Sequence, residues 1–322
     1  MQRRSATAAL LALGLAPMAA LAQAWPARPI KIINPFPPGS PVDVVARSVA
    51  QSLEGGLKQS VVVDYKAGAG GTIGAGEVAR APADGYTLLV TSSSTHVIAP
   101  ALRRQMPYDA NNDFVPVALI GYGPTVIVVH PSVPASTLAE FVQYAKANPG
   151  KVSYASSGPG TILHLSGELF AHKTGTQLLH VPYKGAVPAS TDLLGGQVQA
   201  MFDSISNASP QVRAGKLKAL AVVTPERTPL LPGVPTATEA GFPGLDFPAW
   251  LGVFAPAATP KEVVDRIAST LQAAVAQPDV AGKLTQSGIT PAFMAGEAFR
   301  AKLVADQKLV ADLVKVANVP QQ

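Results

Sequence analysis

Apolar residues in this chain form short runs that alternate with longer stretches in which they recur every three or four positions. The short runs are typical of strands, and the longer stretches are typical of helices. Strands are predicted over residues 30–33, 61–63, 86–91, 115–120, 125–129, 152–155, 178–181, 198–202, 217–224 and 250–254. Helices are predicted over residues 41–53, 75–81, 96–102, 138–147, 162–170, 188–194, 261–276, 279–287 and 297–316. This alternation favours parallel sheets in doubly wound α/β domains.

Two places in the chain are predicted to pass between domains. Residues 121–124 split two apolar runs, and the strand at 250–254 follows a connection rich in proline and glycine, 229–248. We therefore expect one lobe from residues 25–125 plus 247–322, a second lobe from 126–246, and a ligand cleft between them.

The stretch from Asn34 to Asp43 leads from a predicted strand directly into a helix. Ser40 is expected to be the N-cap, with Pro41 at the first helical position. Residues 34–42 carry no charged side chain, and the free N–H groups and positive dipole end of the helix face this loop. Such a loop can bind an anion, but it can equally be an ordinary turn between a strand and a helix.

Three other loops have related compositions. Residues 156–161 (Ser-Ser-Gly-Pro-Gly-Thr) repeat the order of strand, small-residue loop and helix in the second half of the chain. Residues 67–74 form a glycine loop after the second predicted strand, and residues 92–95 are four hydroxyl side chains at the end of the third. Ligands of α/β sheets bind at the carboxyl ends of strands, so these loops are candidates to line one site.

Composition and charge exclude several classes of protein. Of the 322 residues, 48% are hydrophobic and 14% charged, which suits a chain with a sizeable core. The net charge is +5, and Arg3 and Arg4 contribute two of those charges. No basic run is interleaved with aromatic residues, so nucleic acid is not an expected partner. The absence of cysteine excludes disulfides, thiolate metal sites and a cysteine nucleophile.

The first 24 residues have the pattern of a signal peptide. Arg3 and Arg4 precede a short apolar stretch, 6–15, and small residues follow it. Cleavage is expected after Ala22 or Ala24, which predicts export by the general secretory route to the periplasm.

The sequence gives little sign of metal or cofactor chemistry. His164, His172 and His180 are too widely spaced for a helical zinc site, and no H-E-x-x-H motif is present. Residues 74–79 fit the dinucleotide fingerprint only loosely, because they lie inside a predicted helix rather than in the turn before it. We expect neither a metal nor a cofactor. His180 is expected to be a hydrogen-bonded core residue.

Catalytic motifs are also missing. There is no G-x-S-x-G elbow and no S-x-x-K, so an enzyme is not expected. A spatial triad built on one of the loop serines cannot be read from spacing, and an exported serine hydrolase stays open as a remote alternative.

A set of motifs in a fixed order then suggests a family. The motifs are Pro35–Gly39 with Asp43 and Arg47, Gly68–Gly74, Asp84–Leu88, Tyr154–Gly158 with His164, His180–Gly185, Asp192–Gly196, Gly215–Ala221, and Val234–Thr236 with Glu239–Gly241. Over essentially the whole chain beyond the leader, this set resembles the Bug-type solute-binding proteins of tripartite tricarboxylate transporters.

The resemblance implies a fold and a function. The fold would be a periplasmic binding protein of two doubly wound lobes, or "Venus flytrap". The protein would be a monomer that captures a small carboxylate, such as a di- or tricarboxylate, an acidic amino acid or an aromatic acid. It would deliver this ligand to a permease of two integral membrane subunits. A related alternative is docking of the loaded protein on a sensor kinase.

The resemblance also implies which residues hold the ligand. A carboxylate would lie between the first loop and the corresponding loop and helix start of the second lobe. The candidate contact residues are Phe36, Pro37, Pro38, Gly39, Ser40, Pro41, Gly70, Gly71, Thr72, Ser92, Ser93, Ser156, Ser157, Gly158, Gly160, Thr161 and Asp203, which ends a predicted strand.

Two positions depart from the family's pattern. Ser40 stands where the family usually has glycine, and Tyr65-Lys66-Ala67 stands where it commonly has Asn-Arg-Pro. Ser40 can cap the helix or reach the ligand. Tyr65 can offer its ring or phenol to an aromatic acid, or it can simply be packed.

Overall fold

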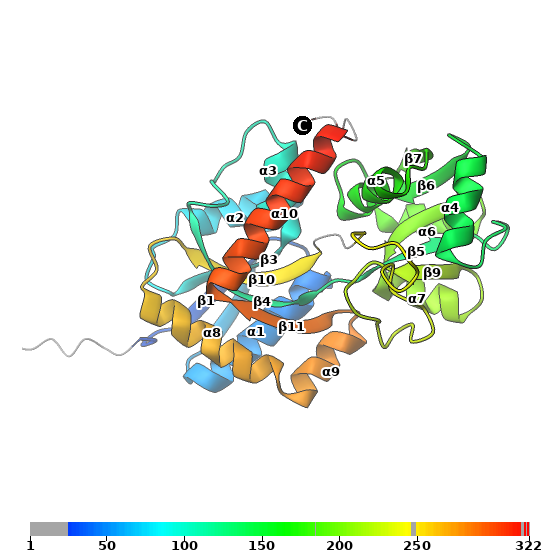
Figure 1. Cartoon of the computed structure of the whole chain (residues 1–322). Coiled ribbons are helices and arrows are strands. Elements are labelled where there is room, and N and C mark those ends of the chain that lie inside the picture. The colour runs from blue at the N-terminus through cyan, green and yellow to red at the C-terminus, as the bar shows by residue number, and fades with distance from the viewer. Residues whose placement is uncertain (1–24, 184, 246–248, 317–318, 320, 322) are drawn as a thin grey trace, which may run out of the picture.

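The computed structural model describes residues 25–322 except 184, 246–248, 317, 318, 320 and 322. The predicted signal peptide, residues 1–24, lies outside the described residues. The described chain forms two lobes joined by crossing segments, each lobe built on its own sheet (Figure 1).

The first sheet has six strands in the order β11-β4-β10-β3-β1-β2. They are β1 (Ile30–Asn34), β2 (Val61–Tyr65), β3 (Thr87–Ser92), β4 (Phe114–Tyr122), β10 (Trp250–Pro256) and β11 (Thr290–Ala295). The second sheet has five strands in the order β7-β6-β8-β5-β9. They are β5 (Thr125–Val129), β6 (Val152–Ser156), β7 (Leu178–Pro182), β8 (Ala200–Ser204) and β9 (Lys218–Val222). The boundaries predicted for the two lobes stay a proposal, and this strand membership supports it.

Helices cover both faces of each sheet, as a doubly wound lobe requires. On the first sheet, α1 (Pro41–Leu57), α8 (Lys261–Val275) and α9 (Pro278–Gln286) pack on one face, and α2 (Thr72–Ala79), α3 (Ala99–Leu102) and α10 (Gly296–Val316) on the other. On the second sheet, α4 (Leu138–Ala147) and α5 (Ile162–Thr174) pack on one face, and α6 (Ala186–Leu194) and α7 (Ile205–Arg213) on the other. Two short turns, η1 (Ala69–Gly71) and η2 (Ser94–Ile98), lie between strands and helices of the first lobe.

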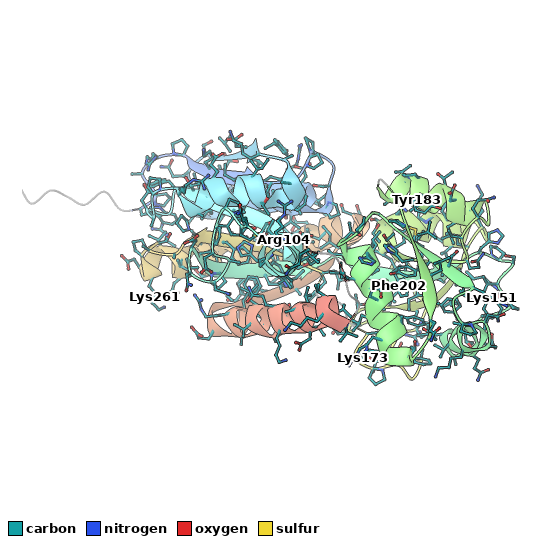
Figure 2. All side chains as sticks on the ribbon, turned by 90° about the horizontal axis from the view of Figure 1, so that it is seen from above. Arg104, Lys151, Lys173, Tyr183, Phe202 and Lys261 are labelled. Carbon is teal, nitrogen blue, oxygen red and sulfur yellow. The ribbon has the colours of Figure 1, made fainter. Side chains whose placement is uncertain are left out.

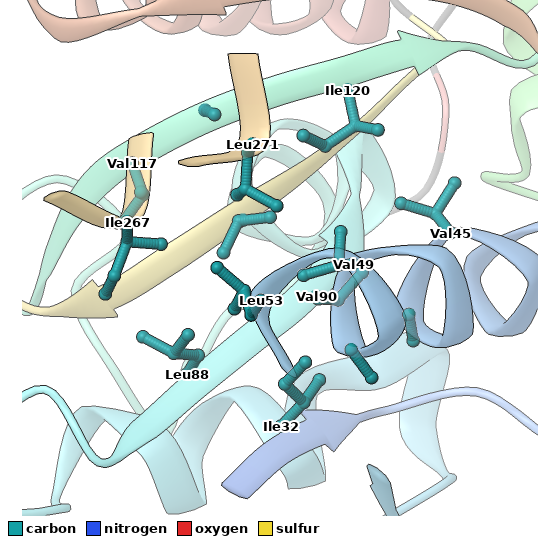
Figure 3. Close-up of a cluster of buried hydrophobic side chains, with 14 of the residues drawn as sticks. Ile32, Val45, Val49, Leu53, Leu88, Val90, Val117, Ile120, Ile267 and Leu271 are labelled. Atoms are coloured by element: carbon teal, nitrogen blue, oxygen red, sulfur yellow. The ribbon is translucent and has the colours of Figure 1, made fainter. Parts of the chain in front are cut away.

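The apolar spacing of α1 explains how this helix is held. Val45, Val49 and Leu53 recur on one face and are buried against Ile32 and Leu88 of the sheet (Figure 3). Ile267 and Leu271 of α8 join the same cluster. Burial of each such side chain stabilises the fold by about 1.5–3 kcal/mol, so the start of α1 is fixed relative to the end of β1.

Both sheets are mixed rather than parallel throughout. Strand β1 is parallel to β2 and β3, and β6 is parallel to β7 and β8. Strand β10, however, is antiparallel to β3 and β4, and β5 is antiparallel to β8 and β9. The reason is that β5 and β10 follow the two passages between the lobes. Each enters its sheet from the edge where the parallel strands end, so each runs antiparallel to them.

Strand β11 was not expected from the sequence. Its residues include Pro291, and the register with β4 shifts between Pro291 and Met294. A proline at an irregular edge strand is tolerated, but it hides the strand from pattern analysis. No helix within the described residues is both long enough and apolar enough to cross a membrane.

Candidate ligand-binding site

A cavity of about 500 Å³ lies between the two lobes. Its walls come from the loop after β1, from the end of β3, from the beginnings of α1 and α5, and from both crossing segments. The two crossings are joined directly, because Gly123 N–H donates to the Ala249 carbonyl at 2.7 Å. The cavity is therefore bounded on one side by the hinge region and on two sides by helix N-termini.

The loop between β1 and α1 is closed by its own side chains. Ser40 is the N-cap of α1, with extended backbone angles, and its Oγ accepts from Asp43 N–H at 3.2 Å. The Asp43 carboxylate returns to the loop and accepts from Gly39 N–H at 2.8 Å. Asn34 Oδ1 accepts from Phe36 N–H at 3.0 Å. These local bonds use the N–H groups of Phe36, Gly39 and Asp43, so these three donors are not available to a ligand.

Asp43 is held by partners from a second strand as well. The Tyr65 hydroxyl donates to Asp43 Oδ1 at 2.7 Å, and Arg47 Nε donates to the same carboxylate at 3.1 Å. Burial opposes ionisation of Asp43, but the hydrogen bonds from Gly39, Tyr65 and Arg47 outweigh it, so the pKa of this carboxyl lies below its usual value. Tyr65 thus supports the loop from behind, and its phenol is engaged by Asp43 and Arg47.

The loop between β6 and α5 has a similar backbone path. Thr161 is the N-cap of α5, and its Oγ1 accepts from His164 N–H at 3.4 Å while donating to the Gly158 carbonyl at 2.8 Å. Gly158 and Gly160 have φ of +131° and +70°, conformations that favour glycine. Ser156 lies fully buried behind the loop and accepts from Gly158 N–H at 3.2 Å.

Two histidines support this second loop. His164 and His180 stack with ring centroids 4.0 Å apart. Gly160 N–H donates to His164 Nδ1 at 3.0 Å, and His180 Nε2 lies 2.7 Å from Ser156 Oγ. Burial lowers the pKa of both imidazoles to about 4, and the neighbouring His180 lowers the pKa of His164 further. Both rings are therefore neutral near pH 7. His180 is hydrogen-bonded as predicted, but it is half-buried on the edge strand β7 rather than in the core. The buried Ser156 has no surface from which to act as a nucleophile.

The glycine loop, residues 67–74, packs closely against Phe36 and Thr95 beside the cavity. At Gly71, φ is +92°, and a Cβ would lie 2.5 Å from Thr95 Cγ2 and 3.1 Å from the Phe36 ring. Only glycine lets η1 approach the first loop and η2 this closely. Gly71 therefore positions Phe36 at the cavity wall without lining the wall itself.

The structure brings about half of the predicted contact residues to the cavity. Those that line it are Phe36, Ser40, Pro41, Gly70, Ser92, Ser157, Gly160 and Thr161. Apart from Asp203, the others lie outside the lining and are either exposed in the first loop (Pro37, Pro38, Gly39) or buried beneath the loops (Gly71, Thr72, Ser93, Ser156, Gly158). The buried ones shape the surface that the ligand would meet.

Asp203, the last of the predicted contact residues, lies outside the cavity lining. It is fully buried at the end of β8, where it accepts from Ser204 N–H at 2.7 Å and from Asn207 Nδ2 at 2.6 Å. Burial raises its pKa to about 6, against the effect of those two hydrogen bonds. Asp203 therefore holds the turn into α7, and its neighbour Ser204 lines the cavity instead.

Several lining residues were missed because they come from unexpected places. Ser94, Ile98, Leu102 and Arg103 reach the cavity through η2 and α3, where a π-turn redirects the chain after β3. Ser287 and Gly288 come from the end of α9, and Ser206 from α7. Only the hydroxyl run 92–95 gave a signal, and it marked one of these positions. Within the part of the chain that is described, no group of three potential metal ligands is found.

Comparison with known proteins identifies the family. The family described as "Tripartite tricarboxylate transporter family receptor" matches residues 45–316. The chain belongs to this family. It is a family of binding proteins rather than enzymes, as the sequence predicted, and the resemblance to Bug-type proteins is confirmed.

Solved structures of relatives agree with the fold. The periplasmic binding protein BugD is 39% identical, with a TM-score of 0.73 over 92% of this chain and 100% of that chain. R. palustris Rpa4515 with adipate is 34% identical, with a TM-score of 0.77 over 92% and 99%. MatC from Rhodopseudomonas palustris with bound malate is 34% identical, with a TM-score of 0.71 over 90% and 99%. The receptor's two-lobed fold is therefore that of periplasmic binding proteins.

Proposed function

We propose that this receptor binds a small carboxylate in the cavity between its lobes and delivers it to the integral membrane subunits of a tripartite transporter. The observation that carries the proposal is the pairing of two helix starts on one cavity. The N-cap and the first two residues of each helix line it: Ser40, Pro41 and Val42 at α1, and Thr161, Ile162 and Leu163 at α5. Each helix directs free N–H groups and a partial positive charge toward its N-terminus, where an anion is stabilised.

The chemistry of the walls supports an anionic ligand with an apolar portion. No carboxylate side chain lines the cavity among the described residues. Hydroxyls of Ser92, Ser157 and Ser204 supply neutral hydrogen-bonding groups. Phe36, Ile162 and Leu163 are half-buried apolar residues of the lining and provide apolar surface. One relative binds adipate and another malate, which agrees with such a ligand.

Export to the periplasm is part of the proposal. It rests on the signal-peptide pattern of residues 1–24 and on the periplasmic relatives. The delivery step rests on the family, whose description names the tripartite transporter.

Isothermal titration of the folded protein against dicarboxylates, acidic amino acids and aromatic acids tests the proposal. We expect one class of acid to bind and the corresponding amides not to bind. A folded protein that binds no acid across the panel contradicts the proposed function.

A pair of N-cap variants tests the site itself. Thr161→Ala should lower the free energy of unfolding by about 1 kcal/mol and weaken binding by about 0.5–1.5 kcal/mol. Thr137 is the matched control, because it caps α4 in the same way, through Glu140 N–H, but does not line the cavity. Thr137→Ala should cost similar stability and leave the affinity unchanged. Equal affinities for both variants remove Thr161 from the site.

A further inference from the structure

Arg103 differs from every other residue that lines the cavity in the described structure, because it alone carries a charge. It directly follows α3 and is half-buried. No sequence pattern predicted a cation here, since the predicted loops are uncharged. A single positive charge on an otherwise uncharged cavity wall favours a ligand that carries an anionic group.

The guanidinium is held at the wall rather than in open solvent. Its Nη2 donates to the Ala69 carbonyl at 2.9 Å. Ala69 and the following Gly70 themselves line the cavity, so the charged end of Arg103 lies beside that surface. Ala69 has φ of +49°, a left-handed conformation within the glycine loop that turns its carbonyl toward Arg103.

Most of the hydrogen-bonding capacity of Arg103 is unused within the protein. A guanidinium has five N–H donors in a fork that matches a carboxylate. Across the described residues, Ala69 O is its one hydrogen-bond partner, and no acidic side chain forms an ion pair with it. The remaining donors are available to a ligand.

We propose that Arg103 is a specificity-determining residue that selects ligands with a second acidic group. This inference rests on the proposed function, in which a first carboxylate lies at the starts of α1 and α5. Arg103 stands on a separate element of the first lobe, the end of α3, with the apolar side chains Ile98 and Leu102 beside it on the wall. The ligand class that fits is a diacid whose two acidic groups are separated by an apolar spacer.

Matched pairs of acids test this assignment. The probes are the straight-chain diacids from succinate to suberate, each compared by titration calorimetry with the monoacid of equal carbon number. The wild-type protein should bind at least one diacid at least tenfold more tightly than its monoacid. Arg103→Gln should weaken that diacid by about 10- to 50-fold and leave the monoacid within about twofold, because only the second acidic group loses a charged hydrogen bond.

Two further variants separate charge from folding. Arg103→Lys keeps the charge but loses the fork, and should weaken the diacid by no more than about fivefold. Arg104, labelled in Figure 2, is an exposed neighbour outside the cavity lining, and Arg104→Gln should bind as the wild type does. Melting temperatures of the ligand-free variants show whether each one is folded.

The possible outcomes distinguish the two proposals. Equal loss of diacid and monoacid in Arg103→Gln, or no loss of either, overturns the role of Arg103 while the proposed function stands. The same conclusion follows if the wild type does not prefer diacids. If the wild type binds none of these acids, the diacid assignment is wrong. Titration against the wider panel of acids then tests the proposed function separately.

Discussion

The two loops on either side of the cavity have the same backbone plan, but one has charged support and the other uncharged support. Each joins a strand to a helix through an N-cap hydroxyl, Ser40 in the first lobe and Thr161 in the second. The first loop is held by an ionised carboxylate, Asp43, and the second by two neutral imidazoles, His164 and His180. A cavity wall of uncharged residues can therefore be held in place by charged or by uncharged support.

The difference predicts how each loop responds to change. Asp43 accepts hydrogen bonds from the loop, from α1 and from β2 at once, so its removal should affect the whole first loop. The imidazoles hold the second loop through single bonds to Gly160 and Ser156. We therefore expect a larger effect in the first lobe than in the second.

The largest effect is expected for Asp43→Asn. The amide has one acceptor oxygen instead of two, and its NH₂ group faces the donors of Gly39 and Arg47. Stability should fall by about 2–4 kcal/mol, measured by urea unfolding, and ligand affinity should fall with it. Asp279 is the control, an exposed acid in the first turn of α9. Asp279→Asn should cost less than about 1 kcal/mol. Similar losses for the two variants would mean that Asp43 acts only through the helix dipole.

His164→Ala is expected to have the next largest effect. It leaves Gly160 N–H without its acceptor and opens space beside His180. The variant should lose about 1–3 kcal/mol of stability and bind the ligand more weakly. His172→Ala, on the exposed side of the same helix, controls for loss of a histidine from α5 and should change neither. If binding is unchanged in His164→Ala, the histidine pair does not shape the binding surface.

The pH dependence should separate the two loops without mutation. His164 and His180 have pKa values of about 4 in the folded protein, below the ordinary 6.5, so the unfolded chain binds more protons between these values. Stability should therefore fall as the pH is lowered from 6.5 toward 4, by on the order of 1–2 kcal/mol at pH 5 for each imidazole. Asp203, whose pKa is raised to about 6, should offset part of this loss. Asp43, whose pKa is lowered, stays ionised over this range.

Hydrogen exchange at each loop measures this contrast. A protonated His164 Nδ1 cannot accept from Gly160 N–H, so protection should be lost at residues 156–161 before residues 35–43 as the pH falls. Loss of protection at both loops together would indicate global unfolding instead. His164→Ala should show a smaller change with pH than the wild type.

The sequence predicted the elements of this site better than its contacts. Periodicity located β1, α1, β6 and α5, and N-cap chemistry placed Ser40 at the start of α1, because these signals are local. The N-cap role of Thr161 was found only in the structure. Arg103 was missed because the π-turn η2 redirects the chain after β3, and such a turn has no clear sequence pattern. Asp203 was assigned to the cavity because its strand ends there, although the side chain of a strand's last residue can point either inward or outward.

The smallest effect is expected for Tyr65→Phe, and it decides what this departure from the family does. The Tyr65 hydroxyl donates to Asp43 across 22 positions of sequence, a contact that no local pattern reveals. The sequence left open a direct role for Tyr65 in holding an aromatic acid, whereas the structure directs its phenol to Asp43 and Arg47. Loss of this one bond should cost about 0.5–1.5 kcal/mol of stability. Affinity should change by less than about threefold for every class of acid, because Asp43 keeps its bonds from Gly39 and Arg47.

Tyr144→Phe is the matched control, since the Tyr144 hydroxyl has no hydrogen-bond partner among the described residues. It should change stability by only a few tenths of a kcal/mol. Urea unfolding and calorimetry on both variants give the comparison. A loss of affinity in Tyr65→Phe that is confined to aromatic acids would return Tyr65 to the ligand site. If stability falls by the same amount without ligand and with every acid, Tyr65 supports the first loop. It would then act on Asp43 in the first lobe as the two histidines act on the loop of the second lobe.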